Sequence, residues 1–393
     1  MAKSDVIRQG LHQTGDAPHP FLGAAAENQA MRHLALARAV ILSPRQTSHP
    51  ANWLTVSLYA AMTSSGNNAD RTKMTPTNQF QLAQPILGQL KTFLSIGECM
   101  VEMAPIDQAG DFRMGFAGDT FNTSWYMRTL RPDVETRYFT QVGTDAVSHS
   151  MLDMMVDAGV DTSFIAQDPV RSVGLYLISL KDGERSFSYW RDQSAARKLA
   201  QDAASLTRAM QGADLIYFSG ISLAILDAQG RQTLLETLSE ARANGKRIAF
   251  DSNLRPRLWA SNDEMTSTVM KAAAVSDIIL PSYDDEADFF GDANIEATGT
   301  RYLNAGAKTV VIKNGGGAVH YLHDGISHHI DPPQVGEIID TTSAGDSFNA
   351  GFFAGLDRAT SMEDLIRSAA KVAGQVIGRK GALVPLDLSK ITP

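Results

Sequence analysis

Short apolar strands alternate with amphipathic helices along most of this chain, and this alternation restricts the folds that it can adopt. The apolar segments at 213–220, 247–253, 277–282 and 308–317 have the length and composition of strands, and helical patterns lie between them. Such an order predicts an α/β fold, in which a parallel sheet is covered by helices on both faces. In sheets of this kind, ligands bind beyond the carboxyl ends of the strands.

Further elements extend this pattern on both sides. We expect strands at 93–103, 137–143, 172–180, 184–191 and 338–340, a late hairpin over 318–330, and helices through most of 346–380. The lone Asp-Gly pair at 182–183 fits a hairpin that joins two of these strands.

Residues 1–92 differ from the rest of the chain because they are polar and rich in turn-forming residues, as at 64–79. We expect them to form an N-terminal extension that is poorly ordered or lies outside the main fold. The regular pattern starts at Phe93, so residues 93–393 are predicted to form one domain. With 44% hydrophobic residues, the chain can bury a sizeable core.

Charge and composition exclude several classes of partner. The net charge is −8 and no block is rich in lysine or arginine, which argues against nucleic acid. No apolar run reaches the roughly 18 residues of a membrane span, and the first twenty residues lack the apolar core of a signal peptide. The single cysteine, Cys99, leaves no intramolecular disulfide, which fits a reducing compartment. We therefore expect a cytoplasmic protein without a membrane partner.

The segment DTTSAGDSFNAGFF at 340–353 places a turn of small residues between a predicted strand and an apolar helix. Backbone N–H groups at such a helix start attract anions. Two interpretations of Asp346 remain open on this ground. It either caps the helix, or it accepts a proton from a hydroxyl group that attacks a phosphate held by the turn. The chain has neither a G-x-x-x-x-G-K-[ST] loop nor a G-x-G-x-x-G fingerprint after a strand, which argues against a nicotinamide oxidoreductase.

This segment resembles the C-terminal signature of the ribokinase-like (PfkB) carbohydrate kinases, and AGDTFNTSWYMRTL at 117–130 resembles their N-terminal signature. The elements GLYLISLKDGERSFSYWRDQSAA and FDSNLRPRLWAS are similar to those of the 2-keto-3-deoxygluconate kinases within this family. The resemblance runs from about Phe93 to the C-terminus. It implies a three-layer α/β/α sandwich with a mostly parallel central sheet, and a small β-sheet lid from parts of 93–130 and 172–191.

The resemblance also implies an activity, the transfer of the ATP γ-phosphate to the 6-hydroxyl of 2-keto-3-deoxygluconate. Asp346 matches the catalytic base of the family, and the backbone of Ser343, Ala344 and Gly345 matches its anion hole. The residues that match its sugar and substrate contacts are Gly118, Asp119, Asn122, Tyr176, Tyr189, Arg191 and Arg255. A guanidinium binds a carboxylate through two parallel hydrogen bonds, which suits Arg191 for a sugar acid.

The expected cofactors are ATP with Mg²⁺ and a monovalent cation such as K⁺. The loop at Lys313, Asn314 and Gly315 resembles the loop near the nucleotide. Asp340 and Thr342 resemble positions near the monovalent-cation site, and either Asp285 or Glu286 resembles the acid near Mg²⁺. The expected partners are the sugar acid, ATP and further copies of the chain, in a dimer or larger homo-oligomer.

Two departures from the family pattern affect the choice of substrate. The sugar-binding turn begins with Ala117-Gly118 where Gly-Gly is usual, and Ser343 stands where glycine or alanine is commoner. The alternatives are a kinase for another sugar, such as fructose or a related keto-deoxy acid, and a non-catalytic sugar-binding regulator. Arg191 separates the first alternative from a sugar-acid kinase, because a neutral sugar offers it no carboxylate.

Four histidines lie close together in the late hairpin: His320, His323, His328 and His329. Imidazole is a common zinc ligand. However, no cysteine or ordered spacing accompanies these residues, so we expect a solvated hairpin without a metal.

Overall fold

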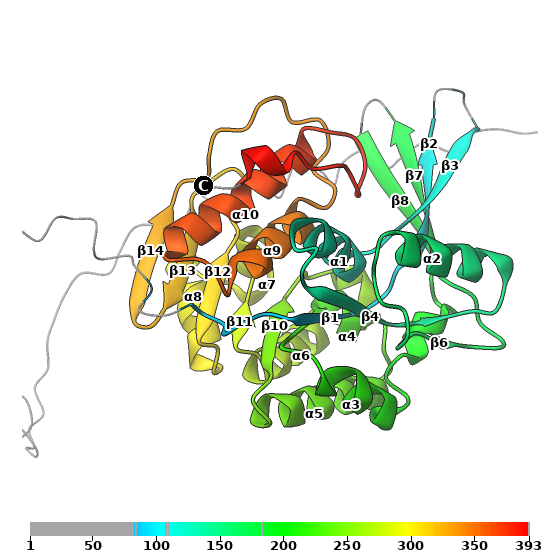
Figure 1. The fold of residues 1–393 in the computed structure, drawn as a ribbon, viewed down its shortest axis with the longest axis horizontal. Coiled ribbons are helices and arrows are strands. Elements are labelled where there is room, and N and C mark those ends of the chain that lie inside the picture. Colours follow the sequence, from blue (N-terminus) through cyan, green and yellow to red (C-terminus); the bar gives the residue numbers. More distant parts are fainter. Residues whose placement is uncertain (1–81, 83–84, 107, 109, 182–183, 392–393) are drawn as a thin grey trace, which may run out of the picture. The chain divides into compact units, whose positions relative to one another are not determined.

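The computed structural model describes residues 82, 85–106, 108, 110–181 and 184–391 (Figure 1). Most of the predicted N-terminal extension, residues 1–81, therefore lies outside the described residues. Those nearest the predicted boundary already belong to the body: Leu87 and Leu90 are buried, and the Leu87 N–H donates to the carbonyl oxygen of Leu356. No helix among the described residues is long and apolar enough to cross a membrane.

The described residues contain an eight-stranded sheet in the order β14-β13-β12-β11-β10-β9-β1-β4. Its strands are β1 (Thr92–Ile96), β4 (Glu135–Phe139), β9 (Leu215–Ser219), β10 (Arg247–Asp251), β11 (Ile278–Ile279), β12 (Thr309–Ile312), β13 (Val319–His323) and β14 (Ile326–Ile330). The strands from β4 to β12 are parallel, whereas β13 and β14 pair antiparallel at the edge. The predicted parallel sheet and the late hairpin are thus confirmed.

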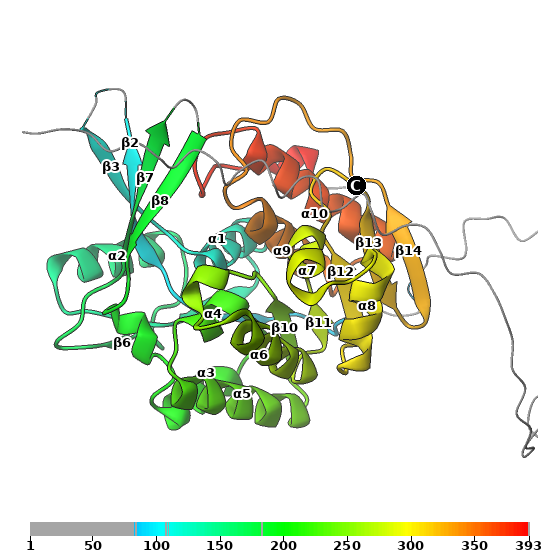
Figure 2. The same ribbon diagram turned by 180° about the vertical axis from the view of Figure 1, so that it is seen from behind.

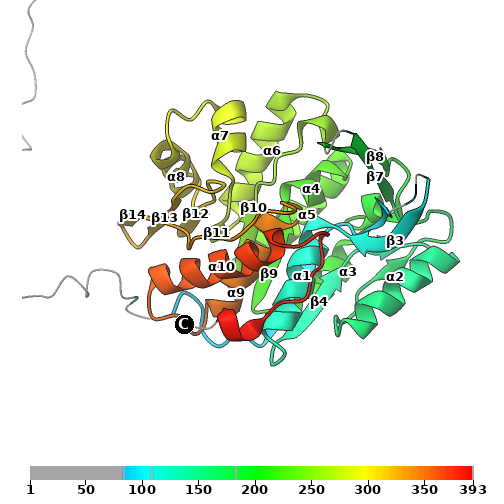
Figure 3. The same ribbon diagram turned by 90° about the horizontal axis from the view of Figure 1, so that it is seen from above.

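Helices cover both faces of this sheet, and Figure 3 shows the two helical layers on either side of it. One layer holds α1 (Asp119–Leu130), α2 (Ala146–Asp157), α9 (Ala344–Gly355) and α10 (Met362–Ile377). The other holds α3 (Ala203–Gln211), α4 (Gly220–Ala224), α5 (Ala228–Ala243), α6 (Asn262–Ala274), α7 (Tyr283–Phe290) and α8 (Ile295–Asn304). Neighbouring strand residues serve opposite layers: Ile216 packs with the second layer and Tyr217 with the first. This alternation explains why the strands read as continuous apolar runs.

A second sheet, in the order β3-β2-β7-β8, stands apart from the large sheet (Figures 1 and 2). Its strands are β2 (Met100–Pro105), β3 (Phe112–Ala117), β7 (Leu175–Lys181) and β8 (Glu184–Trp190). β7 and β8 form the predicted hairpin, with Tyr176 opposite Tyr189. These strands fall within the ranges from which the lid was expected. Two residues each of β5 (Gln141–Val142) and β6 (Ala166–Gln167) form a small parallel pair.

Two predicted strands are each divided between two sheets. Segment 93–103 contains the end of β1 in the large sheet and the start of β2 in the small one, with Gly97 between them. A side chain at Gly97 would overlap the hydroxyl oxygen of Thr120, so the break requires glycine. Segment 137–143 is likewise divided between β4 and β5. Apolar composition alone does not reveal where the chain leaves one sheet for another.

The predicted strand at 338–340 is wrong, because this segment belongs to no strand. Ile338 and Ile339 are 58% and 54% exposed. The backbone N–H groups of Ile339 and Asp340 both donate to the carbonyl oxygen of Ile377, at the end of α10. The helix terminus thus provides the backbone partner that a neighbouring strand would otherwise supply.

Candidate active site

Three of the predicted motifs meet at the carboxyl edge of the large sheet. Asp251 ends β10 and Lys313 directly follows β12, while the amino ends of α1 and α9 bring in Asp119 and Asp346. α1 packs against α9, so the N-terminal and C-terminal signatures lie side by side although more than 200 residues separate them. The position agrees with the expectation that ligands bind beyond the carboxyl ends of parallel strands.

Asp346 is the third residue of α9 and does not cap it. The N-cap position belongs to Ser343, which has φ of 64° and makes no side-chain capping bond. Asn122 of α1 donates its side-chain N–H to Oδ2 of Asp346 at 2.8 Å, and Thr123 Oγ1 donates to the Asp346 carbonyl oxygen at 3.2 Å. The structure therefore brings two predicted residues, Asn122 and Asp346, into direct contact.

The charges around Asp346 favour its protonated form. Burial and the negative charges of Asp119 and Asp251 raise the pKa of Asp346 to about 7, although the hydrogen bond from Asn122 acts in the opposite direction. A carboxyl group with this pKa changes protonation state near neutral pH, which is the range suited to a general base.

A network of polar side chains fixes the floor of the site. Lys313 Nζ pairs with Asp251 Oδ2 at 2.7 Å and donates to Asn349 Oδ1 at 3.2 Å. Asn349 Nδ2 in turn donates to Asp251 Oδ2 at 2.6 Å, and Asn253 Nδ2 donates to Asp119 Oδ2 at 2.7 Å. The sequence motifs alone do not point to Asp251, Asn253 or Asn349. The first two belong to the DSNLR element from which only Arg255 was selected.

The small-residue turn before α9 is strained and closely held. Ser343 adopts the left-handed region at φ 64°, which costs free energy in a residue other than glycine. The Ala344 N–H already donates to the Thr341 carbonyl oxygen at 3.2 Å. A side chain at Gly345 would contact the Lys313 amino group at 3.6 Å, so this turn faces the same lysine that pairs with Asp251.

Asp340 supports the turn through both carboxylate oxygens. Oδ1 accepts from the Thr342 N–H at 3.0 Å, and Oδ2 accepts from the Gly381 N–H at 2.7 Å. The carboxylate therefore links the turn to the C-terminal segment, and its buried position keeps both bonds away from water.

Gly118 fits its position because it approaches another backbone closely. A Cβ atom at Gly118 would overlap the carbonyl oxygen of Glu98, which follows the end of β1. The preceding Ala117 is buried with Met100, Tyr176 and Ile178 of the small sheet, so its methyl group packs within that sheet's apolar cluster.

We expect Gly118→Ala to lower the free energy of unfolding by about 1–3 kcal/mol, because a carbonyl oxygen cannot move aside as a side chain can. It should also lower kcat/KM by displacing Asp119 and Asn122. Gly336→Ala is the matched control, since a side chain there would meet nothing within 4 Å. Denaturant unfolding and steady-state kinetics on both variants measure the effect. Equal stability of the two variants would contradict the close approach.

Arg191, the predicted partner of a substrate carboxylate, already has a carboxylate partner. It is 6% exposed and donates from Nε to Oε2 of Glu98 at 2.9 Å, with a second contact from its terminal nitrogen. Glu98 is also buried, and its other oxygen, Oε1, has no hydrogen-bond partner among the described residues. The sequence analysis missed Glu98, whose backbone oxygen also lies against Gly118.

The two predicted tyrosines share one face of the small sheet. Their ring centroids are 6.0 Å apart, and Phe187 lies 6.2 Å from Tyr176. Tyr176 is buried and its hydroxyl donates to Glu102, whereas Tyr189 is 53% exposed. Of the two, Tyr189 has the surface that a sugar ring could cover.

The structure separates the two acids proposed near Mg²⁺. Asp285 lies 3.8 Å from Arg255, and the charges of Asp251 and Lys313 also act on it. Burial raises the pKa of Asp285 above its ordinary value, although the Arg255 guanidinium acts in the opposite direction. Asp285 and Arg255 are therefore near the Asp251–Lys313 pair, as expected for residues of one site.

Glu286 points elsewhere. Its side chain is fully buried, and Oε2 accepts from Arg301 at 2.7 Å and from the Tyr302 hydroxyl at 2.9 Å. These bonds attach α7 to α8, which is a structural role. Of the two candidate acids, the geometry favours Asp285.

Asn314 and Gly315 lie in the turn that follows Lys313. Gly315 has φ of 52°, and the Gly317 N–H donates to the Asn314 carbonyl oxygen at 2.7 Å. The Tyr283 N–H donates to the Lys313 carbonyl oxygen at 2.8 Å, so this turn is tied to the start of α7, which carries Asp285. The loop that was predicted to lie near the nucleotide and the acid that was predicted to lie near Mg²⁺ are therefore neighbours.

Comparison with known proteins places this chain in a family. The family of pfkB carbohydrate kinases matches residues 91–388. The chain is 39% identical over 308 residues to a 2-dehydro-3-deoxygluconokinase of Escherichia coli, an alignment that covers 76% of this chain and 98% of the relative.

Solved structures show the same fold. A 2-dehydro-3-deoxygluconokinase of Thermotoga maritima has a TM-score of 0.67 at 20% identity, over 77% of this chain and 98% of that one. A putative ribokinase II of E. coli in complex with ATP and Mg²⁺ has a TM-score of 0.65 at 22% identity, over 77% and 96%. The implied α/β sandwich with its separate small sheet is confirmed, and the chain belongs to the pfkB family of carbohydrate kinases.

Proposed function

We propose that this chain transfers the γ-phosphoryl group of ATP to the 6-hydroxyl of 2-keto-3-deoxygluconate, also called 2-dehydro-3-deoxygluconate, giving 2-keto-3-deoxy-6-phosphogluconate. The observation that carries the proposal is the placement of Asp346, with its raised pKa, beside Asn122 and at the start of α9. The name of the E. coli relative supports this choice of substrate.

Asp346 is the proposed general base. As the 6-hydroxyl oxygen bonds to the γ-phosphorus, the bond from that phosphorus to the β–γ bridging oxygen breaks and ADP leaves. The hydroxyl proton passes to Asp346, which Asn122 orients. The turn at 343–345 and the start of α9 face the negative charge that develops on the transferring group, with Lys313 beside Gly345.

Mg²⁺ takes oxygen ligands and is usually held by one or two carboxylates together with substrate phosphates. Asp285 fits this requirement, because it is a half-buried carboxylate close to the nucleotide loop. When bound, the ion would neutralise phosphate charge. We propose Asp285 as its carboxylate, and Arg255 as a second positive charge near the phosphates.

Asp285→Asn should raise the KM for Mg·ATP by about tenfold and leave the KM for the sugar nearly unchanged, because one charged ligand is lost. Asp284→Asn is the matched control, since Asp284 is the exposed neighbour on the same helix. Steady-state kinetics with varied Mg²⁺ at constant ATP provide the measurement. If the two variants behave alike, Asp285 is not near the metal.

Further proposals rest on the family resemblance. We propose that Asp340 and Thr342 lie beside a K⁺ ion, which would stabilise the turn before α9. We also propose that residues 93–393 form the bulk of the kinase domain, that Leu87 and Leu90 pack into its body while the chain before them is an extension, and that the enzyme is a cytoplasmic homo-oligomer. Activity with and without K⁺, and sedimentation of the full chain, would check the first and last of these.

A kinase for a neutral sugar is the second candidate. The observation that favours it is the buried Glu98–Arg191 pair, because an arginine held by Glu98 has no free charge for a substrate carboxylate. A coupled assay of ATP consumption over a panel of sugar acids and neutral sugars tests both candidates. The first requires the highest kcat/KM with 2-keto-3-deoxygluconate. The absence of ATP consumption with every sugar would leave a non-catalytic regulator.

A further inference from the structure

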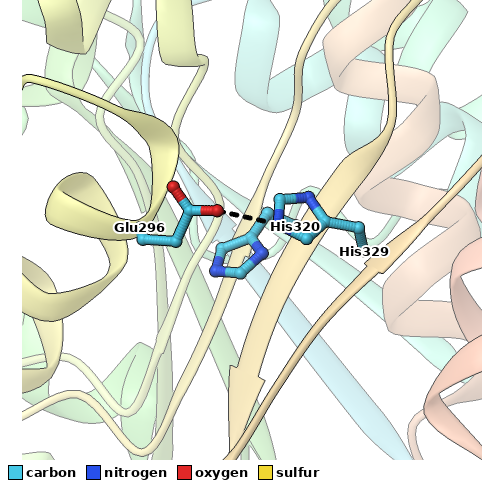
Figure 4. A group of neighbouring side chains, drawn as sticks. All are labelled: Glu296, His320 and His329. Carbon is cyan, nitrogen blue, oxygen red and sulfur yellow. Dashed lines mark hydrogen bonds and ion pairs between the residues drawn. The ribbon is translucent and has the colours of Figure 1, made fainter.

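Three side chains with metal-binding atoms converge at the outer edge of the large sheet (Figure 4). They are Glu296 in the first turn of α8, His320 in β13 and His329 in β14. One ligand atom from each lies within 4.8 Å of the other two. The proposed kinase function uses none of these residues.

Strand register explains why the histidines meet. His320 and His329 stand directly opposite each other in the antiparallel pair β13–β14, and their ring centroids are 4.2 Å apart. His329 Nε2 and Glu296 Oε1 are 2.9 Å apart, which joins the helix to the edge strand. The sequence spacing of the histidines does not show this arrangement, because it depends on the pairing and on α8.

His320 does not fit the solvated hairpin that the sequence suggested. It is 1% exposed, and its Nδ1 has no hydrogen-bond partner among the described residues. Its Nε2 lies 3.3 Å from the Ser327 hydroxyl. Burial of an unpaired polar atom costs free energy, and a ligand bound to Nδ1 of His320 would remove this cost.

The donor atoms of the group suit a transition-metal cation. His320 and His329 supply imidazole nitrogens and Glu296 supplies a carboxylate oxygen, and all three are ligand types that such ions accept. An ion pair between Glu296 and His329 does not include His320, whose ring instead lies against the Ser327 hydroxyl and the backbone of His328.

We propose that Glu296, His320 and His329 bind a divalent transition-metal ion, with Zn²⁺ as the best fit. Two imidazoles and a carboxylate are established zinc ligands, and water would complete a tetrahedral set. Such ligands lie about 3.3 Å apart around one ion. The side chains of Glu296 and His329 are 51% and 46% exposed, so both can move the short distance inward. Mg²⁺ does not suit the site because it prefers oxygen ligands.

A metal in this position would connect α8 to the β13–β14 hairpin. Within this cluster of three side chains, the link between α8 and the hairpin is the exposed contact between His329 and Glu296. Three coordination bonds would hold the edge of the sheet more firmly, so binding should stabilise the fold without entering the reaction.

The test is Zn²⁺ binding to the full, untagged chain by isothermal titration calorimetry, with absorption of Co²⁺ as a second measurement. We expect His329→Gln and Glu296→Gln each to weaken Zn²⁺ binding at this site at least 10-fold and to abolish the visible bands of tetrahedral Co²⁺. The melting temperature should rise by a few degrees with Zn²⁺ in the unmodified chain and much less in these variants. Mg²⁺ should have no such effect.

His328→Gln is the matched control. His328 neighbours His329 but lies opposite Tyr321, on the other face of the strand pair, so its replacement should leave Zn²⁺ affinity unchanged. Both test variants alter exposed side chains, so they should fold. The histidines at 12, 19, 33 and 49 are present in every variant and cancel in the comparison. Equal Zn²⁺ affinity and Co²⁺ spectra in all variants would overturn the proposal, as would no Zn²⁺ binding to the unmodified chain.

Discussion

Replacing Asp346 by asparagine should lower kcat by about 10²–10⁴-fold, with a much smaller change in the KM for the sugar. Asparagine keeps the size of the side chain and can still contact Asn122, but it cannot accept the proton of the attacking hydroxyl. The loss should therefore appear in the chemical step. Stopped assays at saturating ATP and sugar measure kcat directly.

The same carboxyl group should control the pH dependence. Since the pKa of Asp346 is about 7, kcat/KM should rise with pH through 7 as the base form accumulates. Asp288→Asn, which changes an exposed acid of α7, should keep the profile of the unmodified enzyme. Retention of most of the turnover by Asp346→Asn, or of the rise near pH 7, would refute the assignment of the base.

The free energy of unfolding should fall as the pH rises, whereas kcat/KM should increase. The pKa of Asp346 is higher in the folded chain than in the unfolded one, so its ionisation destabilises the fold as the pH rises from about 4 to 7. The asparagine variant lacks this charge. At pH 8 it should be more stable than the parent by on the order of 2 kcal/mol, and at pH 4 the difference should vanish. Urea unfolding at both pH values checks the sign.

If Arg191 binds the substrate carboxylate as the family resemblance implies, its replacement by alanine should lower kcat/KM for the sugar acid by about 10²-fold or more. It should also lower the free energy of unfolding by about 3–5 kcal/mol, because Glu98 would remain buried and unpaired. The two effects need separate measurements, by kinetics below the melting temperature and by unfolding.

Three companion variants separate the structural role of Arg191 from its role with substrate. Arg113→Ala, on the exposed side of β3, is the control and should change neither quantity. Glu98→Gln should free the charge of Arg191 and lower the KM for the acid. Arg191→Lys keeps the positive charge and should restore part of the lost stability. If Arg191→Ala affects a sugar acid and fructose equally, the acid specificity must be abandoned.

The sequence predicted a candidate site at the carboxyl edge of the sheet, and the fold brings both signatures together there, because each signature is a local pattern at the start of a helix. It could not predict the partners across the chain. Lys313 pairs with Asp251 and Arg191 pairs with Glu98, and each pair joins elements that only the tertiary fold brings together. The preference for Asp285 over Glu286 likewise depends on which way each side chain points from α7, because Glu286 pairs with the partly buried Arg301.

The sequence also did not predict where strands end or where the chain passes from one sheet to the other. A run of apolar residues at 93–103 does not reveal that Gly97 passes the chain from one sheet to the other. The isoleucines at 338–339 have the composition of a strand, but they lie at the surface beside the end of α10. The composition of a segment shows that it could form a strand, but its tertiary contacts determine whether it does.

The hydrogen bond between Asn122 and Asp346 spans 224 residues of sequence. A contact of such range forms slowly, because most of the chain must be ordered before its ends can meet. During synthesis, α1 leaves the ribosome long before α9, so Asn122 lacks its contact with Asp346 until α9 has emerged. A nascent chain that ends before α9 would hold Asp119 and Asn122 but would lack Asp346, the proposed base. The proposed base therefore meets its partner Asn122 only after α9 has been synthesised.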